Sequence, residues 1–460
     1  MNEEKITNQV EEEISAEFTP HKVEIKNFGT AVAKLFLMSA FGIIFFFIPL
    51  IDGQAPLMWC IDTVSDGLGN AGLALTVIFN ILLLIATPFA KKVPFLERYL
   101  GKDGIVSKVL YVMGAVFGIL IFLNIGPYWL LSADTGGMAL GLARDVLFTV
   151  LIAGMFVTCI ANFGILQFVG ILIEPLMRPL YRLPGYAAMD AATSVACSAA
   201  VDVFMANKIY LNKLYTKRDV SIIAANFTIC SLGFFALLCE IAGIPEYYGL
   251  TVITSFAICF IMPIITSRIP PLSLIPNEFV DGTPFTGDKK VNDGRSLIKR
   301  AWDEAIETAD QGNFKMVIDG IVEACFFAVK TSAYVTSVAT VALILGTYTP
   351  VFDWLGVPFV PILTLFGIPD AATIAPACIV GISEIAMPVM VIADQGVTTA
   401  AAFFVVVLST VQVIFFTESA NAIMESDIPL GFWQLILVFL IRTILAIPML
   451  AVVIHFIIPF

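Results

Sequence analysis

The chain has 460 residues, of which 59% are hydrophobic and only 13% charged, and its mean hydropathy is +0.93. About a quarter of the residues of an ordinary soluble domain are charged, so this composition excludes that class and indicates a membrane protein. Apolar runs long enough to cross about 30 Å of hydrocarbon recur, whereas the alternating segments of a membrane β-barrel do not. We predict an all-α polytopic membrane protein with about 8–10 helical segments.

Much of the net charge of −12 comes from the first 24 residues, which contain seven glutamates. This stretch lacks the cationic start and short apolar core of a signal peptide. We therefore predict an acidic tail at 1–30, with insertion directed by the first span.

The residue types needed for most enzyme chemistry are scarce. The two histidines, His21 and His455, are far apart, and the eight cysteines form no C-x-x-C pair. No phosphate-binding loop, H-E-x-x-H motif or Ser/His pairing is present. We expect no enzyme activity, no metal site and no cofactor.

The N-terminal region, 31–143, reads as three spans joined by short loops. Lys and Arg residues gather between Lys91 and Lys108, and such loops stay in the cytoplasm. This places the N-terminus in the cytoplasm, and a loop is expected at Ala133–Arg144. The predicted spans are Leu35–Ile51, Gly69–Phe89 and Leu110–Leu131.

The next region, 144–268, is less regular. The apolar run Val146–Ile173 is too long for one crossing and is interrupted at Asn162-Phe163-Gly164. Tyr186–Ala206 is rich in small residues and has basic residues on both sides, so we predict a re-entrant element. Val220–Ile244 and Tyr248–Ile265 are expected to cross outward and back.

A polar insertion, Pro270–Asn313, separates the two halves and defines a cytoplasmic linker at 269–316. Within it, Asp293–Ala309 has the periodicity of an amphipathic helix that either lies on the membrane or docks on the bundle. The region 317–460 follows. Its expected elements are the spans Val317–Leu345, Thr399–Phe416 and Phe432–Ile458, with a polar stretch at Thr417–Asp427.

The most unusual stretch is Ile368–Asp394, which is apolar but carries several polar and helix-breaking residues. A carboxylate such as Glu384 at membrane depth is costly unless it is paired, hydrated or bound to an ion. Pro388 has no N–H for the carbonyl of Glu384. Glu384 is thus expected to offer both a carboxylate and a free carbonyl to a cation or polar solute.

Part of this stretch repeats an earlier one. Asp190-Ala191-Ala192-Thr193 recurs as Asp370-Ala371-Ala372-Thr373, and Asp202 matches Glu384 at an offset of 182. Basic residues flank only the first copy, so the two copies are expected to enter the membrane from opposite faces. Inverted repeats with broken helices are a plan of secondary transporters.

The paired Asp-Ala-Ala-Thr segments, Gly381–Pro388 and Thr417–Asn421 resemble bacterial YjiH-type membrane proteins. These carry the Gate, or nucleoside-recognition, domain that is also found in concentrative nucleoside transporters. The resemblance covers Val146 to the C-terminus and implies two Gate-type repeats, at 144–268 and 317–460. The resemblance implies that Ser383, Glu384, Thr417, Glu418 and Asn421 bind the substrate or its coupling ion.

The candidate residues each have a plainer explanation as well. Glu384 could instead form an ion pair with Lys330, and Asp190 and Asp370 could cap helices. Glu418 and Asn421 could be solvated groups at the end of a span. The candidate substrate- or ion-binding residues are Asp190, Thr193, Asp202, Asp370, Thr373, Ser383, Glu384, Thr417, Glu418 and Asn421.

The sequence thus favours a secondary transporter of a small polar metabolite coupled to Na⁺ or H⁺, in a bacterial cytoplasmic membrane. The alternative is a non-transporting membrane component of a signalling or sporulation complex, with the acidic tail as a docking surface. We expect the bilayer and a small-molecule substrate as partners, no nucleic acid, and a homo-oligomer, because helical membrane proteins with internal repeats often oligomerise.

Overall fold

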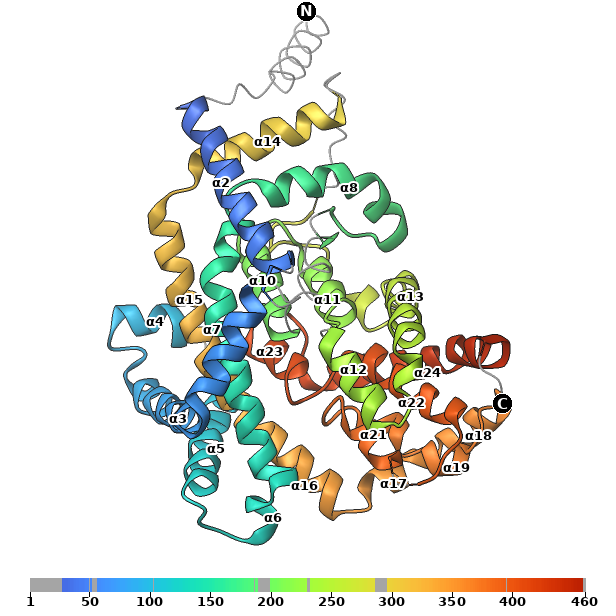
Figure 1. Ribbon diagram of the computed structural model, residues 1–460. Coiled ribbons are helices and arrows are strands. Elements are labelled where there is room, and N and C mark those ends of the chain that lie inside the picture. The colour runs from blue at the N-terminus through green and yellow to red at the C-terminus, as the bar shows by residue number, and fades with distance from the viewer. Residues whose placement is uncertain are drawn as a thin grey trace, which may run out of the picture.

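Figure 1 shows the protein as a computed structural model. The structure describes residues 27–48, 50–51, 56–101, 103–185, 187–188, 199–229, 232–285, 296–393 and 395–457. Within these ranges, seven segments are long and apolar enough to cross a membrane, judged by length and composition. The protein is therefore an all-α polytopic membrane protein, as its composition predicted.

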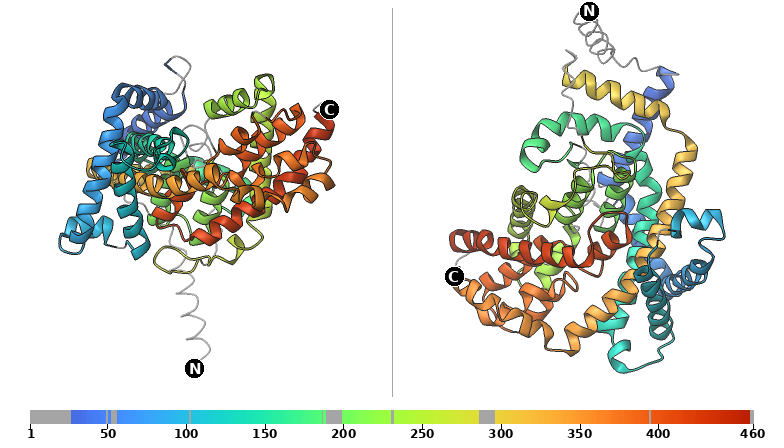
Figure 2. Two further views of the ribbon diagram at one scale, coloured as in Figure 1. Left: turned by 90° about the horizontal axis from the view of Figure 1, so that it is seen from below. Right: turned by 180° about the vertical axis from the view of Figure 1, so that it is seen from behind.

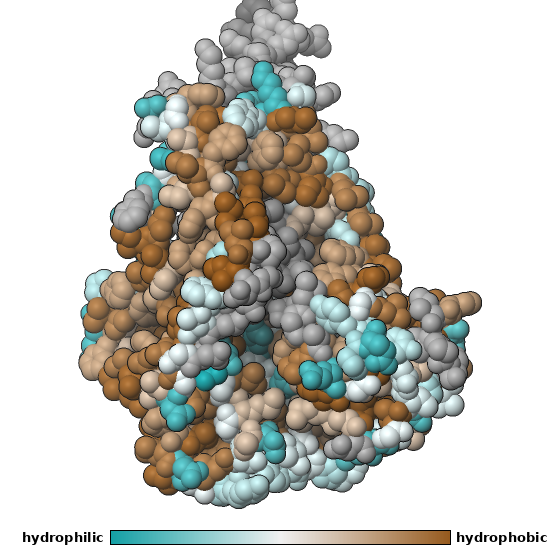
Figure 3. Space-filling model, in the orientation of Figure 1, coloured by the Kyte–Doolittle hydropathy of each residue, from teal (hydrophilic) through white to brown (hydrophobic). Residues whose placement is uncertain are grey.

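The helices form two groups on either side of a central pair. Figures 1 and 2 place the N-terminal helices α3 and α5 on one side and the C-terminal helices α22 and α24 on the other. Apolar side chains cover much of the face shown in Figure 3, which suits contact with lipid. The first group comprises α2 (Phe28–Phe47), α3 (Pro56–Ala86), α4 (Pro94–Leu100), α5 (Ile105–Phe122) and α6 (Tyr128–Leu131).

The third predicted span does not run unbroken to Leu131. Helix α5 ends at Phe122, and Asn124 and Gly126 follow with φ of 55° and 146°, which a helix cannot contain. Pro127 then precedes the short helix α6. The Asn-Ile-Gly-Pro sequence thus ends the helix despite its apolar surroundings.

The expected loop at Ala133–Arg144 is also wrong. It folds as a π-helical turn, Ala133–Gly137, that leads directly into α7 (Met138–Ala161). Small residues such as Ala139 and Ala143 are buried there. Arg144 lies within the helix and pairs with its neighbour Asp145 at 2.7 Å, so it marks no loop.

Helices α7 and α15 (Phe314–Tyr334) are the central pair and lie side by side (Figure 1). A Cβ on Gly154 would lie 2.4 Å from the Cβ of Ala324, so the two backbones approach each other closely. The chain continues from α15 through a π-helical turn, Val335–Ala339, into α16 (Thr340–Tyr348).

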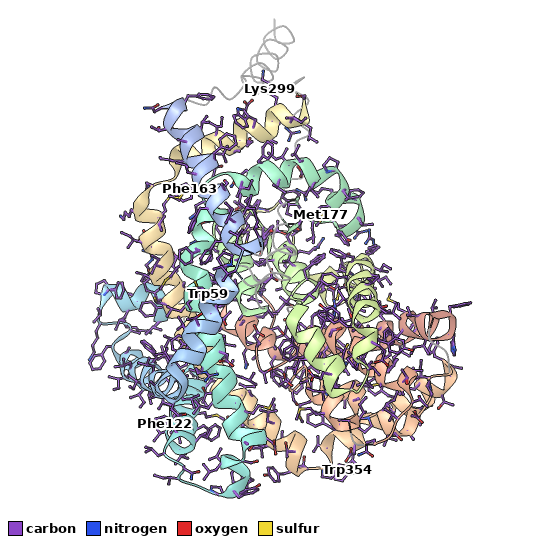
Figure 4. All side chains as sticks on the ribbon, viewed as in Figure 1. Trp59, Phe122, Phe163, Met177, Lys299 and Trp354 are labelled. Carbon is purple, nitrogen blue, oxygen red and sulfur yellow. The ribbon has the colours of Figure 1, made fainter. Side chains whose placement is uncertain are left out.

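The predicted interruption at Asn162-Phe163-Gly164 is confirmed. Helix α7 ends at Ala161, Gly164 has φ of 96°, and α8 (Ile165–Tyr181) starts next. Helix α14 (Leu297–Gln311), whose residue Lys299 is labelled in Figure 4, packs its buried face on α2 and α8. It corresponds to the predicted amphipathic helix and docks on the bundle.

The predicted span Val220–Ile244 is broken rather than continuous. Helix α11 (Lys217–Asn226) stops well before α12 (Leu232–Ile241), and the span Tyr248–Ile265 is found as α13 (Tyr248–Thr266). Of the predicted re-entrant segment, the structure describes the part that enters α10 (Ala199–Leu211). Except for residues 187–188, its first half, with the first Asp-Ala-Ala-Thr copy, lies outside the described residues.

The C-terminal part consists of short helices followed by a broken helix and one long helix. The predicted polar stretch Thr417–Asp427 is mostly helical and buried. The elements are α17 (Val351–Gly356), α18 (Phe359–Leu365), α19 (Ala371–Ile374), α20 (Ala377–Val380), α21 (Met387–Ile392), α22 (Thr399–Gln412), α23 (Ser419–Glu425) and α24 (Phe432–Ile457).

The turn at Gly164 should tolerate no side chain. An added Cβ would lie 2.2 Å from the carbonyl oxygen of Ala305 on α14, at a φ that L-residues rarely adopt. We expect Gly164→Ala to lower the free energy of unfolding by about 1–3 kcal/mol, measured by thermal unfolding in detergent. Gly141→Ala, in the interior of α7 with open space around it, is the control and should be neutral or stabilising. Equal effects of the two variants would contradict this account.

Candidate functional site

Helices α20 and α21 form a hairpin, and Glu384 lies in the break between them. Its side chain is 2% exposed, and its Oε2 accepts hydrogen bonds from the N–H groups of Ala386, at 2.5 Å, and Met387, at 3.1 Å. Glu384 therefore caps the start of α21. The prediction that the Glu384 carbonyl is free is wrong, because this carbonyl accepts a hydrogen bond from the N–H of Met387 at 3.2 Å.

A second break separates α22 from α23, over residues 413–418. Val413 has φ of 52°, an unfavourable conformation for a β-branched residue that is found mainly where function requires it. Ser419 closes the break, since its Oγ donates to the carbonyl of Val413 at 2.6 Å and accepts from the N–H of Phe415 at 3.0 Å. The chain thus changes direction inside the protein without leaving these backbone groups unpaired.

The hairpin and this break are bound to each other. The N–H of Phe416 donates to the carbonyl of Ile382 at 2.8 Å, and the side-chain amide of Asn421 donates to the carbonyl of Phe416. These bonds bring Ser383 and Glu384 to the start of α23, where Thr417, Glu418 and Asn421 lie. Asn421 is buried, so it is not a solvated group at the end of a span, whereas Glu418 is partly exposed.

Glu418 connects this region to the first half of the chain. Its Oε1 accepts from the N–H of Ala200, in the first turn of α10, at 3.0 Å, and its charge interacts with that of Glu384. Asp202 lies two residues further along α10 and is fully buried. Helix α10 contacts α23 (Figure 1), so the two halves of the chain meet at these acidic residues.

Gln412, the last residue of α22, is a further polar group that sequence reasoning missed. Its amide nitrogen donates to the carbonyl of Cys378 and to Thr443 Oγ1, each at 2.8 Å. A Cβ on Gly381 would lie 2.3 Å from its Oε1, so this oxygen faces the hairpin. A glutamine within the apolar run Thr399–Phe416 was the available signal. We call Ser383, Glu384, Gln412, Glu418 and Asn421 the polar cluster.

Three atoms of the polar cluster have unused hydrogen-bonding capacity. Ser383 Oγ, Gln412 Oε1 and Asn421 Oδ1 are buried and have no hydrogen-bond partner among the described residues. An unsatisfied buried polar group costs about 1–3 kcal/mol, so three within one structural unit need an explanation. A polar ligand that donates hydrogen bonds would satisfy them.

Arg442, in the middle of α24, holds the framework behind the cluster. It is fully buried, and all five of its N–H groups are engaged. The guanidinium donates to the carbonyl of Val411, at 3.0 and 2.6 Å, and to Asn226 Oδ1 and the carbonyl of Ala225, at 2.7 and 3.3 Å. Among the described residues no carboxylate pairs with it, and it does not reach the surface.

These acceptors lie at the ends of two broken helices. Ala225 and Asn226 end α11, and Val411 and Gln412 end α22. A helix C-terminus carries roughly half a negative elementary charge, so two such ends offset one guanidinium. Arg442 thus joins the two breaks and orients Gln412 toward the hairpin.

The remaining predicted residues lie elsewhere or outside the described part. Asp370 is exposed, and its Oδ2 accepts from the N–H and the hydroxyl of Thr398, at 2.8 and 2.9 Å, which ties the start of α19 to that of α22. Thr373 is exposed as well. Asp190 and Thr193 lie outside the described residues.

The alternative of an ion pair between Glu384 and Lys330 is wrong. The Lys330 ammonium pairs with Glu425 at 2.8 Å and with Asp103 at 3.0 Å. The Glu384 carboxylate instead contacts backbone N–H groups of its own hairpin, beside the polar cluster. In the described part of the chain, no group of three or more His, Cys, Asp or Glu residues could hold a metal ion.

No model of a known protein family matches the chain. The chain is 31% identical over 393 residues to an uncharacterized protein of Alkalihalophilus pseudofirmus, and the match covers 84% of each. The chain belongs to the family of this protein. Among solved structures it is similar to a double mutant of CNTnw, a concentrative nucleoside transporter, in an outward-facing state. The TM-score is 0.41, with 11% identity over 94% of this chain and 95% of that one. Membership of the YjiH-type family stays a prediction.

The contacts of Arg442 predict that its guanidinium is irreplaceable. Lysine has three donors and cannot reach both helix ends at once, so Arg442→Lys should lower the free energy of unfolding by about 3 kcal/mol, measured by thermal or denaturant unfolding. The control is Arg268→Lys, because Arg268 also donates to backbone carbonyls, those of Ile264, Pro179 and Leu180, but is exposed. That control should cost well under half as much, and a reversed order would refute the role of burial.

Proposed function

We propose that the protein is a secondary transporter that binds a small polar solute at the polar cluster, with Na⁺ or H⁺ as the coupling ion. The observation that carries this proposal is the set of three unsatisfied buried atoms, Ser383 Oγ, Gln412 Oε1 and Asn421 Oδ1. Two are pure acceptors and the third can donate or accept. The cluster therefore suits a solute with N–H or O–H donors, such as a nucleoside, an amino acid or a short peptide.

The backbone around the cluster supports this proposal. Irregular backbone at membrane depth is tolerated where protein or a water-filled cavity covers it, and transporters place substrates at such breaks. Here the hairpin break and the α22–α23 break are bound to each other through Phe416 and Ile382. The strained conformation of Val413 suits a segment that changes conformation when solute enters.

The predicted inverted repeat gives the proposal a second line of support. The helix ends at Asn226 and Gln412 share Arg442, and each is followed by a bond between residues two apart, from Ile229 to Phe227 and from Ile414 to Gln412. Two such broken helices, one in each predicted repeat, would give the two half-cycles of alternating access. The excess of Lys and Arg between Lys91 and Lys108 supports a cytoplasmic N-terminus, and we propose a bacterial cytoplasmic membrane as the location.

The acidic residues offer sites for the coupling ion. Glu384 and Glu418 interact electrostatically. Asp202 is buried on α10, the helix whose residue Ala200 donates its N–H to Glu418. A cation that binds near two carboxylates lowers the cost of their burial. Solute and ion would then favour each other's binding, as symport requires.

A ligand screen tests the proposal directly. Purified protein in nanodiscs is heated with nucleosides, amino acids, dipeptides and organic acids, each with and without Na⁺ at two pH values. A true ligand at 100 times its Kd stabilises by about 2.7 kcal/mol, which raises the apparent Tm. Uptake of that ligand into proteoliposomes should then require an ion gradient.

Ser383→Ala gives the sharpest variant, because the hydroxyl has no partner to lose in the part of the chain that the structure describes. We expect equal or higher stability without ligand, since an unsatisfied group is removed, and at least tenfold weaker binding, which corresponds to about 1.4 kcal/mol. Glu384→Gln keeps an oxygen that can cap α21 while removing the charge, so it should mainly reduce ion dependence.

The matched control is Ser409→Ala on α22. Ser409 is equally buried, but its hydroxyl donates to the carbonyl of Val406 at 2.9 Å. That variant should lose some stability and keep its ligand affinity. The proposal fails if no solute class raises the Tm and no flux depends on an ion gradient.

A further inference from the structure

A buried charge cluster joins α15, α23 and the turn before α5, away from the hairpin. The Lys330 ammonium contacts Glu425 Oε1 at 2.8 Å, Asp103 Oδ1 at 3.0 Å and the carbonyl of Tyr99 at 3.3 Å. These three acceptors use all three N–H donors of the ammonium. We call Asp103, Lys330 and Glu425 the charge triad.

The charges of the triad do not balance. Two carboxylates face one ammonium, and their side chains are only 10%, 4% and 9% exposed for Asp103, Glu425 and Lys330, respectively. With both carboxylates ionised, the triad would carry one uncompensated negative charge. Such a charge is costly where water is excluded, and a buried carboxyl usually takes up a proton instead.

The hydrogen bonds single out one of the four carboxylate oxygens. Asp103 Oδ2 accepts from the Tyr111 hydroxyl at 2.9 Å, and the ammonium occupies Asp103 Oδ1 and Glu425 Oε1. Glu425 Oε2 is buried and has no hydrogen-bond partner among the described residues. A metal cation needs several oxygen ligands, whereas a proton needs one. Glu425 Oε2 is therefore suited to bind a proton and not a metal ion.

The other charged and titratable groups that the structure describes around Glu425 do not supply the missing positive charge. Tyr111 of α5 and Tyr334 of α15 are neutral phenols, and Asp427, just after α23, adds negative charge. On α10, which also packs on α23, Asp202 is acidic and Lys208 pairs with Glu323 at 3.4 Å. On α24 the nearest charged group, Arg442, is engaged with backbone carbonyls.

We propose that Glu425 Oε2 binds an exchangeable proton from bulk solvent, which makes the junction of α5, α15 and α23 a proton-binding site separate from the polar cluster. The site connects the N-terminal helices to α23, whose other end follows Glu418 directly. It requires no solute, so it stands independently of the proposed transport function.

The pKa of Glu425 agrees with this site. Burial raises the pKa to about 7, because desolvation outweighs the attraction of the Lys330 ammonium. An acid whose pKa is higher in the folded than in the unfolded state loses stability as pH rises between those two values. For Glu425 the window runs from about 4.3 in an unfolded chain to about 7 in the folded protein.

Infrared difference spectroscopy tests the site in full-length protein reconstituted in nanodiscs, without solute. We expect a protonated carboxyl C=O band that disappears between acidic and alkaline pH with a midpoint near neutral. Glu425→Gln should remove one component of this band, and that component should persist in Glu384→Gln. Loss of that component in Glu384→Gln but not in Glu425→Gln, or a band that responds to Na⁺ at constant pH, would overturn the assignment.

The pH dependence of thermal unfolding is the second measurement. The apparent Tm of the unmodified protein should fall by several degrees across the window, and that of Glu425→Gln should fall less. Glu384→Gln is the comparison, because this substitution in the polar cluster leaves the charge triad unaltered. It should therefore keep the pH dependence that the triad causes, even if it impairs transport. If Glu425→Gln keeps the full pH dependence, the proton is not on Glu425.

Discussion

The structure depends on the contact of one buried guanidinium with two helix ends. Arg442 donates to carbonyls at the ends of α11 and α22, and so satisfies backbone groups that a broken helix leaves without partners. Without it, two interrupted helices could not end inside an apolar protein. Because Gln412 follows Val411 directly, the same contact sets where the polar cluster begins.

Close packing of small residues places the other parts around this centre. Gly154 and Ala324 allow α7 and α15 to approach, and α15 in turn carries Lys330 to the charge triad. Asn80 of α3 bonds Ser332 of α15 at 2.9 Å and Thr336, in the π-helical turn that follows α15, at 3.2 Å, and these bonds add direction to the packing of this layer. The two buried polar centres thus lie on opposite ends of α23, one at Glu418 and one at Glu425.

The site could be predicted only where a polar residue stood out locally. Glu384, Ser383 and Asn421 were noticeable because each lies beside apolar residues, and the structure brings them together. Gln412 was missed because one glutamine in a span resembles an ordinary interhelical contact. Asp370 was selected because it belongs to the repeated Asp-Ala-Ala-Thr motif, yet its carboxylate accepts hydrogen bonds from Thr398 at the start of α22. A repeated motif does not reveal whether its side chain caps a helix or faces a ligand.

The sequence by itself determined the all-α membrane class, the long spans and the break at Gly164, because hydropathy, length and Gly or Pro act locally. Only the tertiary structure decided which charges meet. Lys330 is 54 residues from Glu384 in the chain, but its partners, Asp103 and Glu425, are more distant in sequence. It also decided that Arg442 binds carbonyls and not carboxylates. Such pairings depend on how helices distant in sequence pack together, which local composition does not reveal.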